Sequence, residues 1–201
     1  MIRFAPTIFL SAFLLFQVQP VISRFILPWF GGGPAVWGTC LVFFQVILLA
    51  GYFYAHVVSE RLPPRVHVWL HLGLLGASLL MLPIVPDAQQ WKPLTAAAPE
   101  SGILLLLLVT VGLPYGLLSS TAPLVQRWYS LTAPGQQPYR LYALSNAGSL
   151  LALLSYPVLV EPVLRLHWQA ISWSWAYVVF AGLSAWCRLG SSSRQGGRAL
   201  P

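Results

Sequence analysis

The stretch Pro28-Trp29-Phe30-Gly31-Gly32-Gly33-Pro34-Ala35-Val36-Trp37 decides the fold, because it separates two apolar runs that are each about as long as a membrane is thick. Proline fixes φ and lacks an amide N–H, and glycine raises the entropic cost of a helix, so the stretch cannot continue a helix. Trp29 and Trp37 bracket the break, as tryptophans do at a membrane–water interface. We therefore predict a tight turn between two transmembrane helices.

The same alternation of apolar run and proline- or glycine-rich break continues along the chain. The apolar runs lie at residues 4–27, 35–58, 67–85, 102–125, 139–160 and 167–186. Each is close to the roughly 20 residues that an α-helix needs to cross about 30 Å of hydrocarbon. We therefore predict an all-α fold, a polytopic membrane protein in which residues 1–189 form a bundle of six transmembrane helices. Residues 190–201 are rich in Ser, Gly and Arg, and we predict a disordered cytoplasmic tail there.

The composition of the 201 residues argues against an ordinary soluble domain. Apolar residues make up 57% of the chain and charged residues only 7%, against about 25% charged residues in a typical soluble domain. The net charge of +7 does not indicate nucleic-acid binding, because the basic residues are spread along the chain without a basic run. We accordingly expect the lipid bilayer, and no nucleic acid, as a partner.

The positions of lysine and arginine predict the orientation of the bundle. Six spans place eight basic residues on the side that holds the N-terminus: Arg3, Arg61, Arg65, Arg127, Arg140, Arg188, Arg194 and Arg198. The other side receives Arg24, Lys92 and Arg165, together with three of the four acidic residues. Cytoplasmic loops of membrane proteins carry the excess of basic residues. We therefore expect both termini in the cytoplasm.

Six polar residues inside the apolar runs form the first candidate site, an intramembrane cluster. They are Gln17, Gln19, Gln45, Ser145, Asn146 and Ser149. Amide and hydroxyl side chains within a span usually hydrogen-bond to a neighbouring helix, and this is our first interpretation. A substrate-binding role for Asn146 is the alternative. Small residues at Gly112, Gly116 and Gly148 predict positions of close helix packing.

Charged residues near the ends of the predicted helices form the second candidate site. Arg24 lies near the end of the first span and Glu161 follows the fifth, both on the outer side. A charge in hydrocarbon is costly unless it is paired or reaches the headgroups. We predict that Arg24 and Glu161 pair across the bundle, with Arg165 as a competing partner. The alternatives are that both reach headgroups independently, or that they form an ion or substrate site.

The sequence predicts no metal, no cofactor and no catalytic centre. Cys40 and Cys187 fall near opposite faces of the predicted bundle, too far apart for a disulfide. Three glycines without a following GK[ST] do not make a phosphate-binding loop. His56 and His71 lie near the inner ends of the second and third runs, where they could titrate or relay protons. We interpret both as interfacial histidines and expect no acidic partner for either.

Blocks of sequence rich in Trp, Gly and Pro follow one another along residues 4–189. In chain order they are Ser11–Pro20, Ile26–Trp37, Phe43–Gln45, Gly51–His56, Thr121–Trp128, Pro138–Leu153, Tyr156–Pro157 and Glu161–Pro162. In this order the blocks resemble the membrane domain of the bacterial fused spermidine-synthase-like family, also described as fused MFS/spermidine synthases. The resemblance implies a multi-pass protein of the bacterial cytoplasmic (inner) membrane.

The resemblance also implies what this chain does not carry. In that family a cytoplasmic Rossmann-like domain, related to aminopropyltransferases or methyltransferases, follows the membrane domain, and no position of this chain matches its catalytic residues. Larger members of the family have more helices, so six would form one half of a transporter-like array. Polyamines are the substrates that the resemblance suggests, but no Asp or Glu falls inside a predicted span to bind a polycation.

We therefore expect a non-catalytic membrane subunit or anchor whose synthase- or methyltransferase-like partner is a separate soluble protein. That partner would dock on the basic cytoplasmic face, at Arg61, Arg65, Arg127 and Arg140. The alternative is a six-helix half-transporter or exporter of small metabolites that works as a homodimer, with proline-broken helices around a midplane site. A membrane enzyme separated from its partner and an assembly role in another complex are further alternatives.

Overall fold

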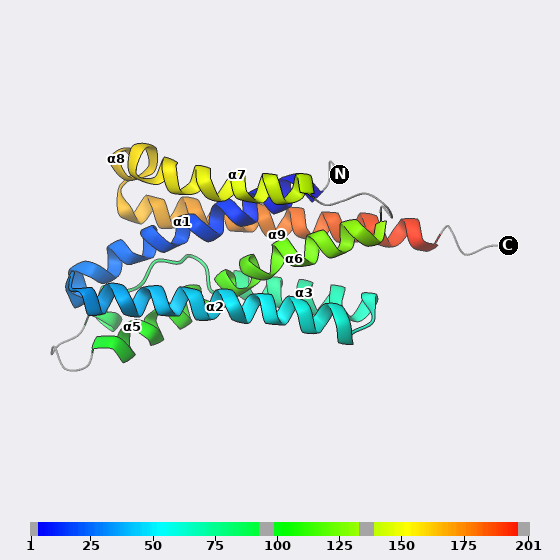
Figure 1. Cartoon of the computed structure of the whole chain (residues 1–201). Coiled ribbons are helices and arrows are strands. Elements are labelled where there is room, and N and C mark those ends of the chain that lie inside the picture. The colour runs from blue at the N-terminus through cyan, green and yellow to red at the C-terminus, as the bar shows by residue number, and fades with distance from the viewer. Residues whose placement is uncertain (1–3, 93–98, 133–138, 197–201) are drawn as a thin grey trace.

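The chain forms helices joined by turns and short connections, in a computed structural model that describes residues 4–92, 99–132 and 139–196. At residues 64, 65, 131, 132 and 188–196 only the backbone is described. The long helices run along a common direction, and the chain passes back and forth between two ends of the bundle (Figure 1). We call the end at which α1 begins the N-terminal end, and the other the opposite end. The described residues contain no strand, which confirms the all-α prediction.

The predicted turn joins α1 (Phe4–Phe30) to α2 (Pro34–Arg61). Gly31 adopts a φ of +92°, a left-handed conformation that side chains disfavour, and its N–H donates to the Leu27 carbonyl at 2.9 Å. Pro34 is the first residue of α2, where the missing N–H costs no helical hydrogen bond. The break therefore lies where the sequence predicts it, and both helices extend slightly beyond the predicted spans.

Two later passes contain π turns next to prolines. α5 (Pro99–Leu107), η1 (Leu108–Gly112) and α6 (Leu113–Thr132) follow one another directly, as do α7 (Tyr139–Ser155), η2 (Tyr156–Val160) and α8 (Glu161–Val163). A proline ring clashes with the carbonyl four residues earlier, and a wider turn relieves the conflict. Pro114 follows η1 and Pro157 lies inside η2, so each pass bends without breaking.

The last helix, α9 (Leu166–Gly196), begins at the opposite end and runs back to the N-terminal end (Figure 1). Its helical backbone continues into the segment 190–201 that the sequence predicts as a disordered tail. Residues 197–201 lie outside the described residues.

The third pass differs from the predicted helix over 67–85. α3 (Pro64–Leu79) has 16 residues, about 24 Å at 1.5 Å per residue, and ends in the middle of the bundle (Figure 1). Pro83 explains this end, because its ring would clash with the carbonyl of Leu79. A non-helical segment, residues 80–87, leads on to the short helix α4 (Ala88–Trp91) at the opposite end. The third pass is thus part helix and part non-helical chain, which begins with a turn at residues 80–82.

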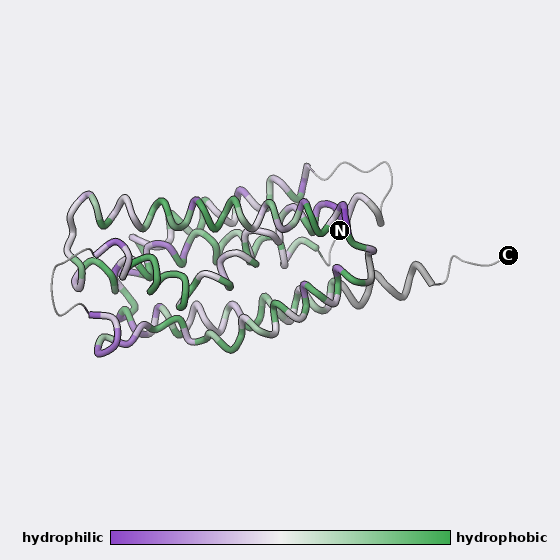
Figure 2. Tube along the Cα trace, turned by 90° about the horizontal axis from the view of Figure 1, so that it is seen from below, coloured by the Kyte–Doolittle hydropathy of each residue, from purple (hydrophilic) through white to green (hydrophobic). Residues whose placement is uncertain are grey.

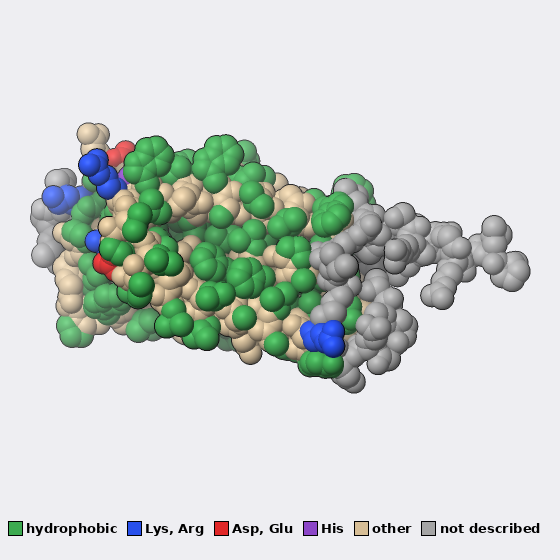
Figure 3. Space-filling model, turned by 90° about the horizontal axis from the view of Figure 1, so that it is seen from above, with side chains coloured by type: hydrophobic (Ala, Val, Ile, Leu, Met, Phe, Trp, Pro, Cys, Tyr) green, Lys and Arg blue, Asp and Glu red, His purple; other side chains and the backbone are tan. Residues whose placement is uncertain are grey.

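Five of the described helices are long and apolar enough to cross a membrane, and Val66–Leu79 is a shorter apolar helix. Hydropathy along the trace is highest between the two ends of the bundle (Figure 2). On the face seen in Figure 3, charged side chains lie towards the two ends and apolar side chains cover the middle. Large apolar side chains are exposed on the bundle, including Phe53 (67% exposed) and Trp175 (68%). These features indicate a multi-pass membrane protein.

α1 is the central helix of the bundle, since it packs against α6, α7 and α9. Its buried face contributes Leu14, Val18 and Ile22 to a core that also includes Tyr115 of α6 and Phe180 of α9. α2 lies on the other side of α6 and packs against α5 and α6. The bundle is therefore built from an α1–α7–α9 group and an α2–α5–α6 group, which meet where α1 contacts α6.

Glycines permit two close helix contacts, only one of which the sequence analysis predicted. A Cβ atom added at Gly148 of α7 would lie 2.7 Å from the Phe9 carbonyl oxygen of α1. One added at Gly51 of α2 would overlap Ser119 and lie 2.6 Å from the Gly116 carbonyl oxygen of α6. Gly148 is thus a packing position as predicted, and Gly116 takes part through its carbonyl. The space beside Gly112 is instead filled by Leu108 and Leu107 of its own pass, so a role in interhelical packing is wrong for Gly112.

Candidate functional site

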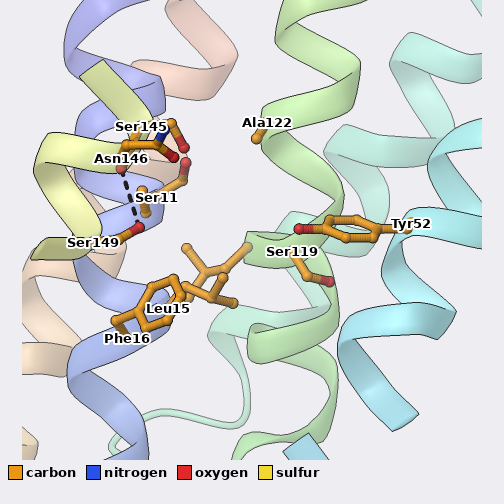
Figure 4. Close-up of a pocket in the computed structure, with 11 residues that line it drawn as sticks. Ser11, Leu15, Phe16, Tyr52, Ser119, Ala122, Ser145, Asn146 and Ser149 are labelled. Carbon is orange, nitrogen blue, oxygen red and sulfur yellow. Dashed lines mark hydrogen bonds between the residues drawn. The ribbon is translucent and has the colours of Figure 1, made fainter. Parts of the chain in front are cut away.

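A groove of about 250 Å³ lies between the α1–α7 pair and the α2–α6 pair (Figure 4). Its polar lining consists of Ser11, Tyr52, Ser119, Ser145, Asn146 and Ser149. Its apolar lining consists of Ala12, Leu15, Phe16, Leu118 and Ala122. None of these eleven residues is acidic or basic. The groove is therefore a polar but uncharged recess within the apolar part of the bundle.

Three of the four serines of the groove use their hydroxyl protons within their own helices. The hydroxyl of Ser11 donates to the Ile8 carbonyl at 2.9 Å, and the hydroxyl of Ser119 donates to the Gly116 carbonyl at 2.8 Å. The hydroxyl of Ser149 donates to the Ser145 carbonyl at 3.1 Å, as the dashed line in Figure 4 marks. These serines leave oxygen lone pairs for a ligand, and little donor capacity.

Asn146 and Tyr52 supply most of the unused hydrogen-bonding capacity of the groove. Asn146 is exposed on α7 and Tyr52 is 48% exposed on α2. Neither side chain makes a hydrogen bond within the part of the chain that the structure describes. The Tyr52 hydroxyl points across the groove from the α2 side, and Asn146 lies on the α7 side (Figure 4). An amide carries two donors and an acceptor, and a phenol carries one donor and one acceptor.

The groove lies in the half of the bundle nearer the N-terminal end. Asn146 is seven residues after the start of α7 at Tyr139, about 10 Å along a helix axis. Ser119 is thirteen residues before the end of α6 at Thr132, about 20 Å along the axis. The polar lining therefore extends from about 10 Å to about 20 Å below the N-terminal end of the bundle.

The structure brings together only half of the predicted intramembrane cluster. Ser145, Asn146 and Ser149 line the groove, whereas the three glutamines do not. The Gln19 amide donates to the Tyr115 hydroxyl at 3.1 Å, which is the predicted interhelical hydrogen bond. Gln17 is half-buried on α1, whereas Gln45 is exposed on α2 and makes no interhelical hydrogen bond within the described residues. Apolar residues cover all sides of α2, and no apolar stripe in the sequence could orient Gln45.

The predicted ion pair is present at the opposite end of the bundle. Arg24 Nη1 lies 3.3 Å from Glu161 Oε1, with 41% and 43% of the two side chains exposed. Beside them the Tyr156 hydroxyl donates to Gln169 Oε1 at 3.1 Å, and the Gln169 amide donates to the Leu164 carbonyl at 2.8 Å. These bonds tie η2 and α8 to α1 and α9. Arg165 is exposed and makes no ion pair within the described residues.

We expect the Arg24–Glu161 pair to contribute little to stability. Both groups are more than a third exposed, and such pairs give coupling free energies of about 0.2–1 kcal/mol. The double-mutant cycle with Arg24→Gln and Glu161→Gln, read by thermal unfolding in detergent, should fall in that range and shrink in high salt. The matched cycle with Arg165→Gln and Glu161→Gln should give a coupling free energy near zero. A larger coupling for Arg165 than for Arg24 would show that Arg165, and not Arg24, pairs with Glu161 in solution.

A buried aromatic and histidine cluster near the N-terminal end was only partly predicted. The Trp128 indole N–H donates to His67 Nε2 at 3.0 Å, and the two rings stack with centroids 5.8 Å apart. The Tyr54 hydroxyl lies 3.3 Å from His71 Nδ1. His67 and His71 are buried on one face of α3, 5% and 2% exposed. The interpretation of His71 as an interfacial residue is therefore wrong, and their spacing of four residues was the signal that pointed to a shared face.

His56 is an exposed residue with an acidic partner that sequence reasoning missed. His56 Nε2 lies 3.5 Å from Glu60 Oε2, one helical turn later on α2, and both side chains are more than 60% exposed. Residues four apart on a helix are neighbours, so this pair was readable from the sequence. The surface position agrees with the interpretation of His56 as an interfacial residue.

Exposed arginines gather at the N-terminal end. Arg61 ends α2, Arg127 lies near the end of α6, and Arg140 lies near the start of α7. These three helix ends lie at the same end of the bundle (Figure 1). None of the three side chains forms an ion pair within the described residues, and Arg140 lies over the Tyr139 ring at 6.0 Å. The side chain of Arg65, the fourth predicted docking residue, lies outside the described part.

No site for a metal ion is present in the described residues, where no group of three or more His, Cys, Asp or Glu side chains comes together. Cys40 and Cys187 are both buried, and they form no disulfide within the described residues. No protein-family model, curated protein or solved structure matches this sequence. The resemblance to the spermidine-synthase-like family therefore stays a prediction.

Proposed function

We propose that this protein is a non-catalytic multi-pass membrane subunit that holds a separate soluble protein at the cytoplasmic face of a bacterial inner membrane. The observation that carries the proposal is the set of exposed arginines Arg61, Arg127 and Arg140 at one end of the bundle. They belong to three different helices, so the surface is built by the fold and not by one basic segment. An exposed guanidinium presents paired N–H donors that suit carboxylates.

The proposed partner is a soluble synthase- or methyltransferase-like protein with an acidic surface patch. Complementary charge speeds association and fixes the register of docking, and each charge-assisted hydrogen bond at the interface adds affinity. The groove favours a non-catalytic role over a catalytic one, because its lining holds no acid, no base and no metal-binding group. A polycationic substrate also finds no carboxylate there.

The test replaces the three arginines together. We expect Arg61→Gln/Arg127→Gln/Arg140→Gln to retain less than about one tenth of the partner that the unchanged protein retains after purification in mild detergent, since each lost charge-assisted bond is worth about 1.5–3 kcal/mol. The readout is the stoichiometry of the bound soluble protein by quantitative mass spectrometry. Retention should also fall as salt concentration rises.

Two control variants separate docking from membrane orientation. Arg61→Lys/Arg127→Lys/Arg140→Lys keeps every positive charge that sets topology, but lacks the guanidinium fork. We expect intermediate retention for this variant. Lys92→Gln/Arg165→Gln at the opposite end should retain the partner fully. Equal loss in all three variants would contradict the proposal.

A half-transporter that works as a homodimer is the second candidate function. The observation that favours it is the third pass, in which helix α3 is followed by the non-helical residues 80–87, with Ile84 and Pro86 buried. Transporters build substrate sites from such discontinuous passes. A homodimer without a soluble partner after the same purification would favour this function over the first.

A further inference from the structure

We infer that the groove between α1, α2, α6 and α7 binds the head of an uncharged lipid that carries hydroxyl and carbonyl groups, such as a diacylglycerol. The site is distinct from the arginine surface and does not rest on the proposed docking function. The inference rests on three properties of the groove: its hydrogen-bonding capacity, its depth and its access.

The hydrogen-bonding capacity of the groove matches a head with both donors and acceptors. Asn146 and Tyr52 offer N–H and O–H donors that no described residue uses. Three serines have already donated their protons within their own helices, so they can offer a ligand only oxygen lone pairs. Two ester carbonyls could accept from the amide and the phenol, and a free hydroxyl could donate to a serine oxygen. A charged head is excluded, because neither an acid nor a base lines the groove to neutralise it.

The depth of the groove also selects against phospholipids. Its polar lining extends from about 10 to about 20 Å below the N-terminal end, measured along the helix axes. A phosphate drawn to that depth would lose its hydration without a cationic partner, which costs several kcal/mol. An uncharged head can sit below the phosphates of its neighbours at a much smaller cost.

Access to the groove is lateral, from the surface that carries exposed apolar side chains. Asn146 is exposed on α7, and its neighbours Leu150 and Leu151 are 57% and 51% exposed. α6 and α7 line the groove from opposite sides, and their strongest packing is against α2 and α1 respectively. The volume of about 250 Å³ is below the roughly 300–1,000 Å³ of sites that enclose a whole drug-sized ligand. It suits a head whose acyl chains remain in the bilayer.

The experiment uses the full chain in phosphatidylglycerol/phosphatidylethanolamine nanodiscs that contain a diazirine-labelled diacylglycerol. Photolabelled peptides are located by mass spectrometry, and unlabelled diacylglycerol serves as the competitor. We expect competable labelling on α6 and α7. Asn146→Leu should lower this labelling about tenfold, because the amide supplies the unused donors. Tyr52→Phe, which keeps the ring and its packing, should lower it severalfold.

Gln45→Leu is the matched control, since Gln45 is also an exposed amide in a membrane-spanning helix but lies outside the groove. Labelling should be unchanged in this variant. Diazirine-labelled fatty acid and alkylamine probes of equal chain length should label the groove peptides at background level. The inference is overturned if either charged probe labels α6 and α7 as strongly as the diacylglycerol probe. It is also overturned if Asn146→Leu and Tyr52→Phe are labelled as strongly as the unchanged protein. A cooperative thermal-unfolding transition shows that both variants are folded.

Discussion

Gly51→Ala is expected to destabilise the bundle by about 1–3 kcal/mol, the usual cost of forcing extra volume into a packed contact. The added Cβ would overlap the Ser119 side chain and lie 2.6 Å from the backbone oxygen of Gly116. The serine could rotate away, but the carbonyl oxygen belongs to the backbone of α6 and can move only with that helix. We therefore expect α2 and α6 to separate, with a lower midpoint of thermal unfolding in detergent.

Gly38→Ala is the matched control in the same helix. Nothing lies within 4 Å of the Cβ that this substitution adds, so only the backbone effect remains. Alanine stabilises a helix interior by roughly 0.5–1 kcal/mol relative to glycine. The two substitutions should therefore shift the unfolding midpoint in opposite directions. A shift of the same sign would mean that α2 and α6 are further apart in solution than the structure places them.

A second substitution separates the side-chain and backbone parts of this contact. Ser119→Ala removes the hydroxyl that a Cβ added at Gly51 would overlap, but leaves the Gly116 carbonyl in place. We expect Gly51→Ala/Ser119→Ala to recover part of the lost stability and no more. Complete recovery of the stability would show that the contact with the Gly116 carbonyl does not contribute to the destabilisation by Gly51→Ala.

The close contact at Gly51 shows what the sequence could and could not predict. Gly148 was identified from the polar and small residues around it, but Gly51 lies in a run of aromatic and apolar residues. Gly51 and Ala55 are four apart, both are buried, and they form a small-xxx-small pair that would have revealed the packing face. The sequence therefore contained the signal for a packing face on α2. Only the structure shows that this face packs against α6.

Predictions from the Pro28–Pro34 break and from charges near helix ends agree with the structure, whereas the lining of the groove could not be predicted because it depends on the rotation of α2. The turn at Gly31 follows from proline and glycine chemistry, which acts within a few residues. The Arg24–Glu161 pair follows from both charges lying near the same end of the bundle. The groove needs four helices in a defined rotation, and the sequence of α2 is apolar on every side, so its lining could not be derived.

The third pass shows that the length of an apolar run does not predict how much of it is helical. Pro83 and Pro86 were recognised as the end of an apolar run, and the run was long enough to be read as one spanning helix. Helical backbone satisfies its own hydrogen bonds, whereas extended chain at membrane depth is tolerated only where other residues satisfy it. Whether residues 80–87 have such partners depends on α9, which follows them by about eighty residues of sequence.

Ser174→Ala is accordingly expected to loosen the non-helical part of the third pass. The backbone N–H of Ile84, a fully buried residue, donates to Ser174 Oγ of α9 at 3.2 Å. Removing the hydroxyl leaves a buried N–H without its acceptor, which costs about 1–3 kcal/mol. We expect a lower unfolding midpoint and faster hydrogen–deuterium exchange confined to the peptide that covers residues 80–87.

Ser184→Ala is the control for this substitution, because it removes a buried hydroxyl from the same helix. Ser184 Oγ has no hydrogen-bond partner among the described residues, so its loss should leave stability unchanged or slightly raised. Ser78 lies just before the non-helical segment, and its hydroxyl is 2.8 Å from the Tyr177 hydroxyl of α9, which gives the segment a second attachment. Exchange in residues 80–87 should therefore rise further in Ser174→Ala/Tyr177→Phe than in either single variant. If exchange rises equally along α3 and α9, the third pass behaves as one unit, and the non-helical segment is not separately held by α9.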